Sequence, residues 1–208
     1  MNKKEVSTFI KTQFPSDFCN LNTFDNEQFV LEKWLSFILQ GYNEFHRKKF
    51  DVQKSIVQNI KNQDLSYIPK TQYNHIIRTT FQRFSCTFQL KKPVLRSFHV
   101  HLYYGLGNKP SQTFITKQFE KIFVWFHFVS RFSSGECSKT VNLHLYNIDE
   151  NKVFPKHGEP IDSLHANSAF TTSCMPETSV YIYRIEEWYK VLMHESFHNF
   201  GLDFSQLD

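Results

Sequence analysis

A short segment near the C-terminus constrains the fold more than any other part of this chain. It reads H-E-S-F-H from His194 to His198, inside a run without proline or glycine that extends from Glu186 to Phe200. Such a run predicts a helix, and Gly201 directly after it is typical of the left-handed residue that ends one. On a helix, positions 194 and 198 share a face, because residues four apart lie about one turn apart. The two imidazoles are therefore expected side by side.

The pattern H-E-x-x-H is typical of zinc hydrolases. We interpret His194 and His198 as zinc ligands and Glu195 as the general base that takes a proton from water. A buried helix with two histidines and a glutamate on one side is costly unless those groups are paired or bind a metal. The alternative is a surface helix on which the pattern occurs by chance.

Composition argues against several other classes of protein. The chain has 208 residues, of which 40% are hydrophobic and 21% charged, so it is long enough for one sizeable globular domain. Its net charge is +4 and its basic residues are scattered, which favours a solvated surface over a nucleic-acid interface. We expect no transmembrane helix, because no stretch of about 18 apolar residues occurs. We expect no secretory signal, because no apolar stretch follows the charged N-terminus.

The cysteines bear on the redox compartment. The four are Cys19, Cys86, Cys137 and Cys174, which are far apart and form no C-x-x-C pair. We therefore expect four free thiols in a reducing compartment. Together with the absence of a secretory signal, this predicts an intracellular protein that is not secreted.

The N-terminal part of the chain is predicted to be helical. Apolar residues recur at three- and four-residue steps from about residue 25 to 61, first around Trp34 and then at Val52, Ile56 and Ile60. A polar exit follows near residues 62–75. We therefore expect an N-terminal helical region at residues 1–75.

The rest of the chain, residues 76–208, mixes strand and helix signals and predicts an α+β domain. Aromatic and β-branched runs predict strands, and one long apolar run predicts a buried helix. The expected elements are strands over Ser85–Leu90 and Ser97–Tyr104, a helix over Thr116–Phe132, strands over Val141–Tyr146, Asn167–Ser173 and Ser179–Arg184, and the motif helix. A loop is expected over residues 147–162.

The order strand, helix, strand, strand, strand, motif helix resembles the N-terminal half of a zincin catalytic domain. The resemblance implies a mixed twisted sheet packed on the active-site helix, with an edge strand that runs beside the cleft and pairs with the substrate backbone. Asn167 and Ala169 lie where that edge strand would be, in a segment similar to the Asn-Ala segment of thermolysin-type enzymes with Ser168 inserted. The alternative for this segment is an ordinary interior strand. His165, just before it, would donate a hydrogen bond to the substrate or to an oxyanion.

Two stretches carry a closer resemblance. They read H-A-N-S-A-F-T-T-S-C from His165 and V-Y-I-Y-R-I-E-E-W-Y-K-V-L-M-H-E-S-F-H-N-F-G-L-D-F-S from Val180. This part, about residues 141–205, resembles uncharacterised metallopeptidases predicted in large nucleocytoplasmic DNA viruses. The resemblance implies a zincin fold with the ligands and base assigned above, and a location in host cytoplasm or virion. It implies no particular substrate.

The third zinc ligand is the open question, since a catalytic zinc usually has three protein ligands. The metzincin pattern H-E-x-x-H-x-x-G-x-x-H fits Gly201 but meets Phe204 where its last histidine should be. Asp203, one residue earlier, is our candidate. Otherwise the ligand comes from outside the chain, since we expect a zincin-like domain without its C-terminal subdomain.

Three further histidines, His99, His101 and His144, lie on predicted strands, either as a second metal site or, more commonly, as hydrogen-bonded strand residues. The sequence thus predicts a zinc-dependent metallopeptidase that acts on a peptide or protein substrate. The alternative is a catalytically weak or inactive zincin-like structural or interaction protein. A nucleic-acid-binding protein is the third and weakest hypothesis.

Overall fold

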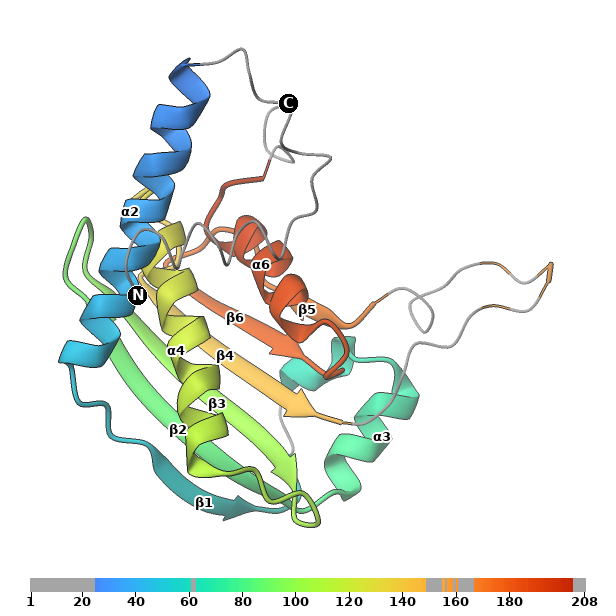
Figure 1. Cartoon of the computed structure of the whole chain (residues 1–208). Helices are drawn as coiled ribbons and strands as arrows, with labels where there is room; N and C mark the ends of the chain where they lie inside the picture. Colours follow the sequence, from blue (N-terminus) through green and yellow to red (C-terminus); the bar gives the residue numbers. More distant parts are fainter. Residues whose placement is uncertain are drawn as a thin grey trace.

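A mixed six-stranded sheet forms the centre of the protein (Figure 1). The computed structural model describes residues 25–60, 63–148, 155, 157–158, 160 and 167–203. The strands are β1 (Gln53–Val57), β2 (Phe81–Leu90), β3 (Arg96–Gly105), β4 (Thr140–Asn147), β5 (Ala169–Thr171) and β6 (Glu177–Ile182). Their order across the sheet is β1-β2-β3-β4-β6-β5. The predicted α+β class, with a mixed sheet and a preceding helix, is confirmed.

The sheet is mixed because one connection crosses over through a helix. Helix α4 (Gln112–Val129) joins β3 to β4, which pair in parallel, as strands joined by a helical crossover do. β4 also pairs in parallel with β6, whereas β5 pairs antiparallel with β6. The motif helix α6 (Trp188–Asn199) follows β6. The predicted order from the second strand to the motif helix is therefore confirmed, and β5 is an edge strand of the described sheet.

Helices cover the two faces of the sheet unequally. α4 and α6 lie over one face, and α2 (Asp25–Arg47) packs along α4 (Figure 1). Phenylalanines fill the interface between helix and sheet, as where Phe98 of β3 stacks on Phe126 of α4 with ring centroids 4.7 Å apart. On the opposite face, the 3-10 helix η2 (Gln63–Tyr67) and α3 (Lys70–Arg78) bury Leu65 and Ile76 in a second, smaller core.

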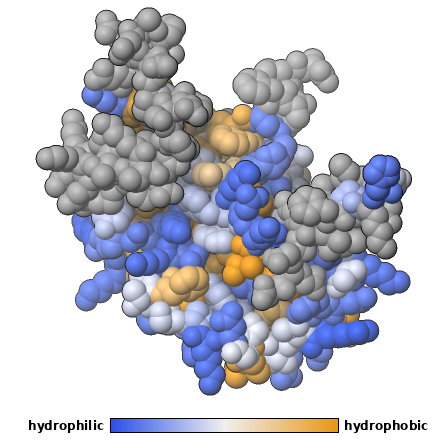
Figure 2. Space-filling view, turned by 45° about the vertical axis from the view of Figure 1, so that its right-hand side comes forward, coloured by the Kyte–Doolittle hydropathy of each residue, from blue (hydrophilic) through white to orange (hydrophobic). Residues whose placement is uncertain are grey.

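The surface is of mixed polarity. On the side seen in Figure 2, hydrophobic residues occur in small groups among hydrophilic ones. Among the described residues, no helix has both the length and the apolar character needed to cross a membrane.

The N-terminal part differs from the sequence prediction. Residues 53–57 form strand β1 and not the expected helix, and a helix, α3, occupies part of the expected polar exit. β1 pairs with β2, with Ile56 opposite Gln82, so the two predicted regions on either side of residue 75 contribute to one sheet. Ile56 is 66% exposed, as expected of a side chain on an edge strand. Residues 1–24 of the predicted helical region lie outside the described residues.

The prediction of four free thiols is wrong, because Cys137 and Cys174 form a disulfide. The loop after α4 and the turn between β5 and β6 run together here, and Ser138 N donates to Met175 O at 2.7 Å. A cross-link between residues 37 apart stabilises the fold by about 4 kcal/mol in the chain-entropy description. Cys86 is free and buried, and burial raises the pKa of its thiol to about 11. Cys19 lies outside the described residues.

Candidate metal centre

The middle of the motif anchors α6 to the rest of the protein. Ser196 is fully buried, and its hydroxyl accepts a hydrogen bond from Trp125 Nε1 of α4 at 3.1 Å and donates to Leu192 O at 2.6 Å. Phe200, at the end of the helix, packs on Phe126 with ring centroids 6.0 Å apart. These contacts fix the rotation of α6 about its axis. His194 on the same helix is left exposed at the surface.

The two motif histidines meet as the spacing predicts. His194 Nε2 and His198 Nε2 lie 3.3 Å apart, and the ring planes are inclined by 80°. A tetrahedral zinc with Zn–N bonds of about 2.0–2.1 Å requires two nitrogens about 3.3–3.4 Å apart. The pair therefore has the separation at which both nitrogens can bind one zinc ion.

The end of α6 explains how Asp203 is positioned. Gly201 N donates to His198 O at 3.2 Å and Leu202 N to Phe197 O at 2.8 Å, which together form a Schellman turn. Gly201 has a φ of 64°, as predicted for the helix stop. The turn reverses the chain, so that residue 203 comes back alongside the last turn of the helix.

Asp203 occupies a different position from the one expected of a third ligand. Its Oδ2 lies 2.5 Å from Nδ1 of His198. Nδ1 and Nε2 lie on different edges of the imidazole, so a carboxylate at Nδ1 is directed away from a metal at Nε2. Because a carboxylate only accepts, it holds the ring proton on Nδ1 and leaves the lone pair of Nε2 available to a metal. The structure thus assigns Asp203 to orienting His198.

The disulfide supports the same turn. A Cβ at Gly201 would lie 2.9 Å from Cys137 Sγ, so any other residue would collide there in addition to straining the backbone. From the loop that precedes the disulfide, Ser133 Oγ donates to Phe200 O at 2.8 Å. Ser138 Oγ donates to Asn199 O at 2.7 Å. Free carbonyls at the C-terminal end of the helix are thereby satisfied.

Glu195 borders a hollow of about 270 Å³ next to the motif. Burial raises the pKa of its carboxyl, and the neighbouring imidazoles of His194 and His198 oppose this shift. The residues around the hollow are Asn167, Ser168, Ala169, Glu187, Lys190, Val191, His194 and Glu195. The structure therefore brings Asn167 and Ala169 together with His194 and Glu195. Glu187 and Lys190 also border this hollow, although the motif does not include them. Lys190 lies about one turn before His194 on α6, and Glu187 lies about two turns before it, at the N-cap of the helix.

A third metal ligand is not found among the described residues, and one further predicted residue lies outside them. In the part of the chain that the structure describes, no group of three or more His, Cys, Asp or Glu residues is placed to hold a metal. His165 lies outside the described residues. Tyr183, directly after β6, is 1% exposed, and burial raises the pKa of its hydroxyl to about 12.

The strand histidines are hydrogen-bonded to neighbouring side chains. His101 Nδ1 lies 2.9 Å from Ser85 Oγ, and His144 Nδ1 lies 3.2 Å from Tyr103 OH. Burial lowers the pKa of His101 to about 4 and that of His144 to about 3, so both are neutral at pH 7. These contacts fit the reading of hydrogen-bonded strand residues.

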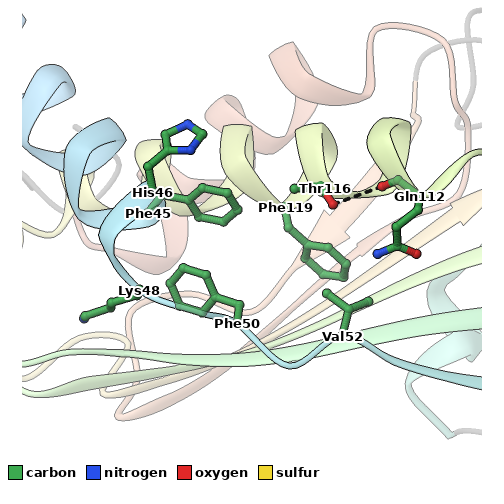
Figure 3. Close-up of a pocket in the computed structure, with 8 residues that line it drawn as sticks. All are labelled: Phe45, His46, Lys48, Phe50, Val52, Gln112, Thr116 and Phe119. Carbon is green, nitrogen blue, oxygen red and sulfur yellow. Dashed lines mark hydrogen bonds between the residues drawn. The ribbon is translucent and has the colours of Figure 1, made fainter.

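A separate hollow of about 320 Å³ lies between α2, the segment before β1, and α4 (Figure 3). The rings of Phe45 and Phe50 stack inside it with centroids 5.0 Å apart. Its two basic residues are paired, His46 with Glu120 at 2.8 Å and Lys48 with Glu44 at 2.5 Å. None of the motif residues borders it, so it is not part of the candidate centre.

Comparison with protein-family models, with curated proteins and with solved structures finds no match to this chain. The resemblance to viral metallopeptidases and the zincin fold therefore both stay predictions.

Proposed function

We propose that this protein is a zinc-dependent peptidase. The observation that carries the proposal is the 3.3 Å separation of His194 Nε2 and His198 Nε2, which matches two ligands of a tetrahedral zinc. If the motif had arisen by chance on a surface helix, nothing would require the two Nε2 atoms to lie at this separation. Nothing would require a carboxylate, that of Asp203, at Nδ1 of His198 either. The third protein ligand would come from outside the described residues.

Glu195 would act as general base. Zinc bound by the two histidines would polarise a peptide carbonyl and lower the pKa of a bound water. The Glu195 carboxylate would accept a proton from the attacking water and pass it to the leaving amine, as a positioned carboxylate can. Glu195 is partly buried at the hollow, so bulk water competes less for hydrogen bonds to its carboxylate.

Strand β5 would hold the substrate. It pairs only with β6 among the described strands, so one edge is available for a further strand. A peptide that adds to this edge would run past Asn167 and Ala169, which border the same hollow as His194 and Glu195. Its scissile bond would then lie beside the base.

The experiment that tests this function is removal and return of zinc. The purified chain is incubated with a mixture of extended peptides, and products are identified by mass spectrometry. We expect cleavage that disappears after dialysis against a chelator and returns with one equivalent of zinc. Cleavage that survives complete zinc removal would exclude the proposal.

Replacing Asp203 tests its role on His198. We expect Asp203→Asn to weaken zinc binding about 10- to 100-fold, the usual effect of removing a partner that orients a metal-binding histidine. The asparagine can still accept from Nδ1 but carries no charge. Zinc affinity is measured by competition with a chromophoric chelator. Asp51→Asn, at an exposed position, is the matched control and should bind zinc as the unaltered chain does.

One observation favours a second candidate function, a zincin-like interaction protein with little or no catalysis. No third metal-binding side chain accompanies the two histidines among the residues described. Zinc binding with the expected dependence on His194, but no cleavage of any peptide in the mixture, would support this candidate over the peptidase.

A further inference from the structure

A larger hollow, of about 450 Å³, lies along the other end of β5. Its border includes Tyr67, Phe170 and Met175, together with the hydroxyl-bearing Thr172 and Ser179. No charged residue borders it among the residues described. It contains none of the motif residues, and the proposed hydrolysis makes no use of it.

The hollow presents an aromatic surface. Tyr67 packs on Phe170 with ring centroids 5.4 Å apart, and Phe170 stacks on Tyr181 at 4.7 Å and 12°. Tyr67 is nevertheless 76% exposed and Met175 is 46% exposed. Exposed aromatic and thioether groups around a neutral hollow favour a large apolar or aromatic ligand group.

The backbone of β5 connects the two hollows. Tyr183 N donates to Ser168 O at 3.0 Å and Thr172 N to Ser179 O at 3.2 Å, so these positions of the strand face β6. Along an antiparallel strand the backbone N–H and C=O groups of successive residues point alternately to the two neighbouring strands, so those of Ala169 and Thr171 point to the edge of β5 that no described strand occupies. They can bind a further strand.

The side chains of β5 alternate between the faces of the sheet in the same way. Ala169 packs in the core that contains Leu192 of α6, whereas Phe170 packs with Tyr181 on the opposite face. A strand added at the edge would alternate too, and direct one set of side chains to the motif side and the other to the Tyr67 side. The hollows are a few residues apart on β5, on the order of 10 Å at about 3.3 Å per residue.

We propose that the hollow bordered by Tyr67, Phe170 and Met175 is a specificity subsite for one large apolar or aromatic side chain of an extended peptide bound along β5. The side chain belongs to a residue about two to four positions from the bond beside Glu195. Its place in cleavage rests on the proposed peptidase function, but binding of the peptide does not.

The test measures binding without hydrolysis. Fluorescein-labelled ten-residue peptides carry a single Phe at successive positions of a Thr- and Gln-rich background, with an all-background peptide as reference. Anisotropy titrations use the zinc-free chain. The backbone contacts allow the peptide to shift along β5, so we expect Phe at any interior position to raise affinity over the all-background peptide about tenfold or more, as burial of one phenyl group would.

Tyr67→Ala should reduce this preference to less than about twofold. Because Tyr67 is 76% exposed, its replacement should leave the melting temperature of the chain almost unchanged. Phe114→Ala, at an aromatic residue of α4 that is 43% exposed, is the control and should keep the preference. Phe peptides that bind no more tightly than the all-background peptide, or an unchanged preference in Tyr67→Ala, would overturn the subsite. Equally tight binding of N-acetyl-phenylalanine amide would also overturn it, because the hollow would then be a small-molecule site.

The two proposals fail separately. A Tyr67-dependent preference in a chain that never cleaves peptides would keep the subsite and reject the peptidase. Zinc-dependent cleavage with no Tyr67-dependent preference would keep the peptidase and reject the subsite.

Discussion

Glu195→Gln should lower the rate of peptide cleavage by about 100- to 10,000-fold, the usual contribution of general acid–base catalysis. The change keeps the shape of the side chain and removes its ability to accept a proton. It leaves His194 and His198 in place, so zinc content should be unchanged. Initial rates on one peptide identified from the mixture, together with zinc per chain by elemental analysis, measure both effects.

The matched control is Glu136→Gln. The side chain of Glu136 is 83% exposed and forms an ion pair with Lys139 at 3.2 Å. Removing its charge should leave the rate within about twofold, since surface substitutions change little. Full activity in Glu195→Gln would show that the base is another group, even if the chain proves to be a zinc enzyme.

His194→Ala should abolish zinc binding at stoichiometric concentrations. One of two imidazoles 3.3 Å apart is lost, and the effect should exceed the roughly 100-fold that loss of an orienting partner can cause. His194 is exposed, and alanine favours a helix, so thermal stability without metal should be almost unchanged. Zinc per chain and the melting temperature of the zinc-free protein separate lost binding from lost folding.

His99→Ala serves as the control for this change. His99 lies on β3 and its Nδ1 is 3.2 Å from Thr87 Oγ1, away from the motif helix. Its loss should not alter zinc content. Zinc retained in full by His194→Ala would remove the basis of the proposed function, since the 3.3 Å pair would then be an ordinary contact between two imidazoles.

Much of the fold could be predicted from the sequence, namely those helices and strands whose own pattern of apolar residues specifies their structure. The apolar run that forms α4 and the alternating run that forms β4 both bury their side chains in the core, so periodicity alone identifies them. β1 carried no such signal. It lies at an edge, and its conformation depends on pairing with β2, a contact that spacing within residues 53–57 does not encode.

Some residues of the candidate site could likewise be predicted from the sequence, and others could not. His194, Glu195 and His198 follow from local helix geometry, so a five-residue pattern was enough. The position of Asp203 depends on the direction of the turn at Gly201, and one residue more or less would have sent it elsewhere. Strands β4 and β5 lie between Cys137 and Cys174 in the sequence. Only the assembled sheet brings the two cysteines close enough to form the disulfide.

That disulfide makes the preparation buffer a variable of every zinc measurement on this protein. A thiol reductant that opens Cys137–Cys174 would release the loop whose Ser133 and Ser138 hydroxyls bind the end of α6. The turn at Gly201, packed on Cys137 Sγ, would lose its support, and with it the approach of Asp203 to His198. A weak zinc affinity recorded under dithiothreitol would describe a loosened pocket, so the oxidised and reduced chains should be assayed as two different samples.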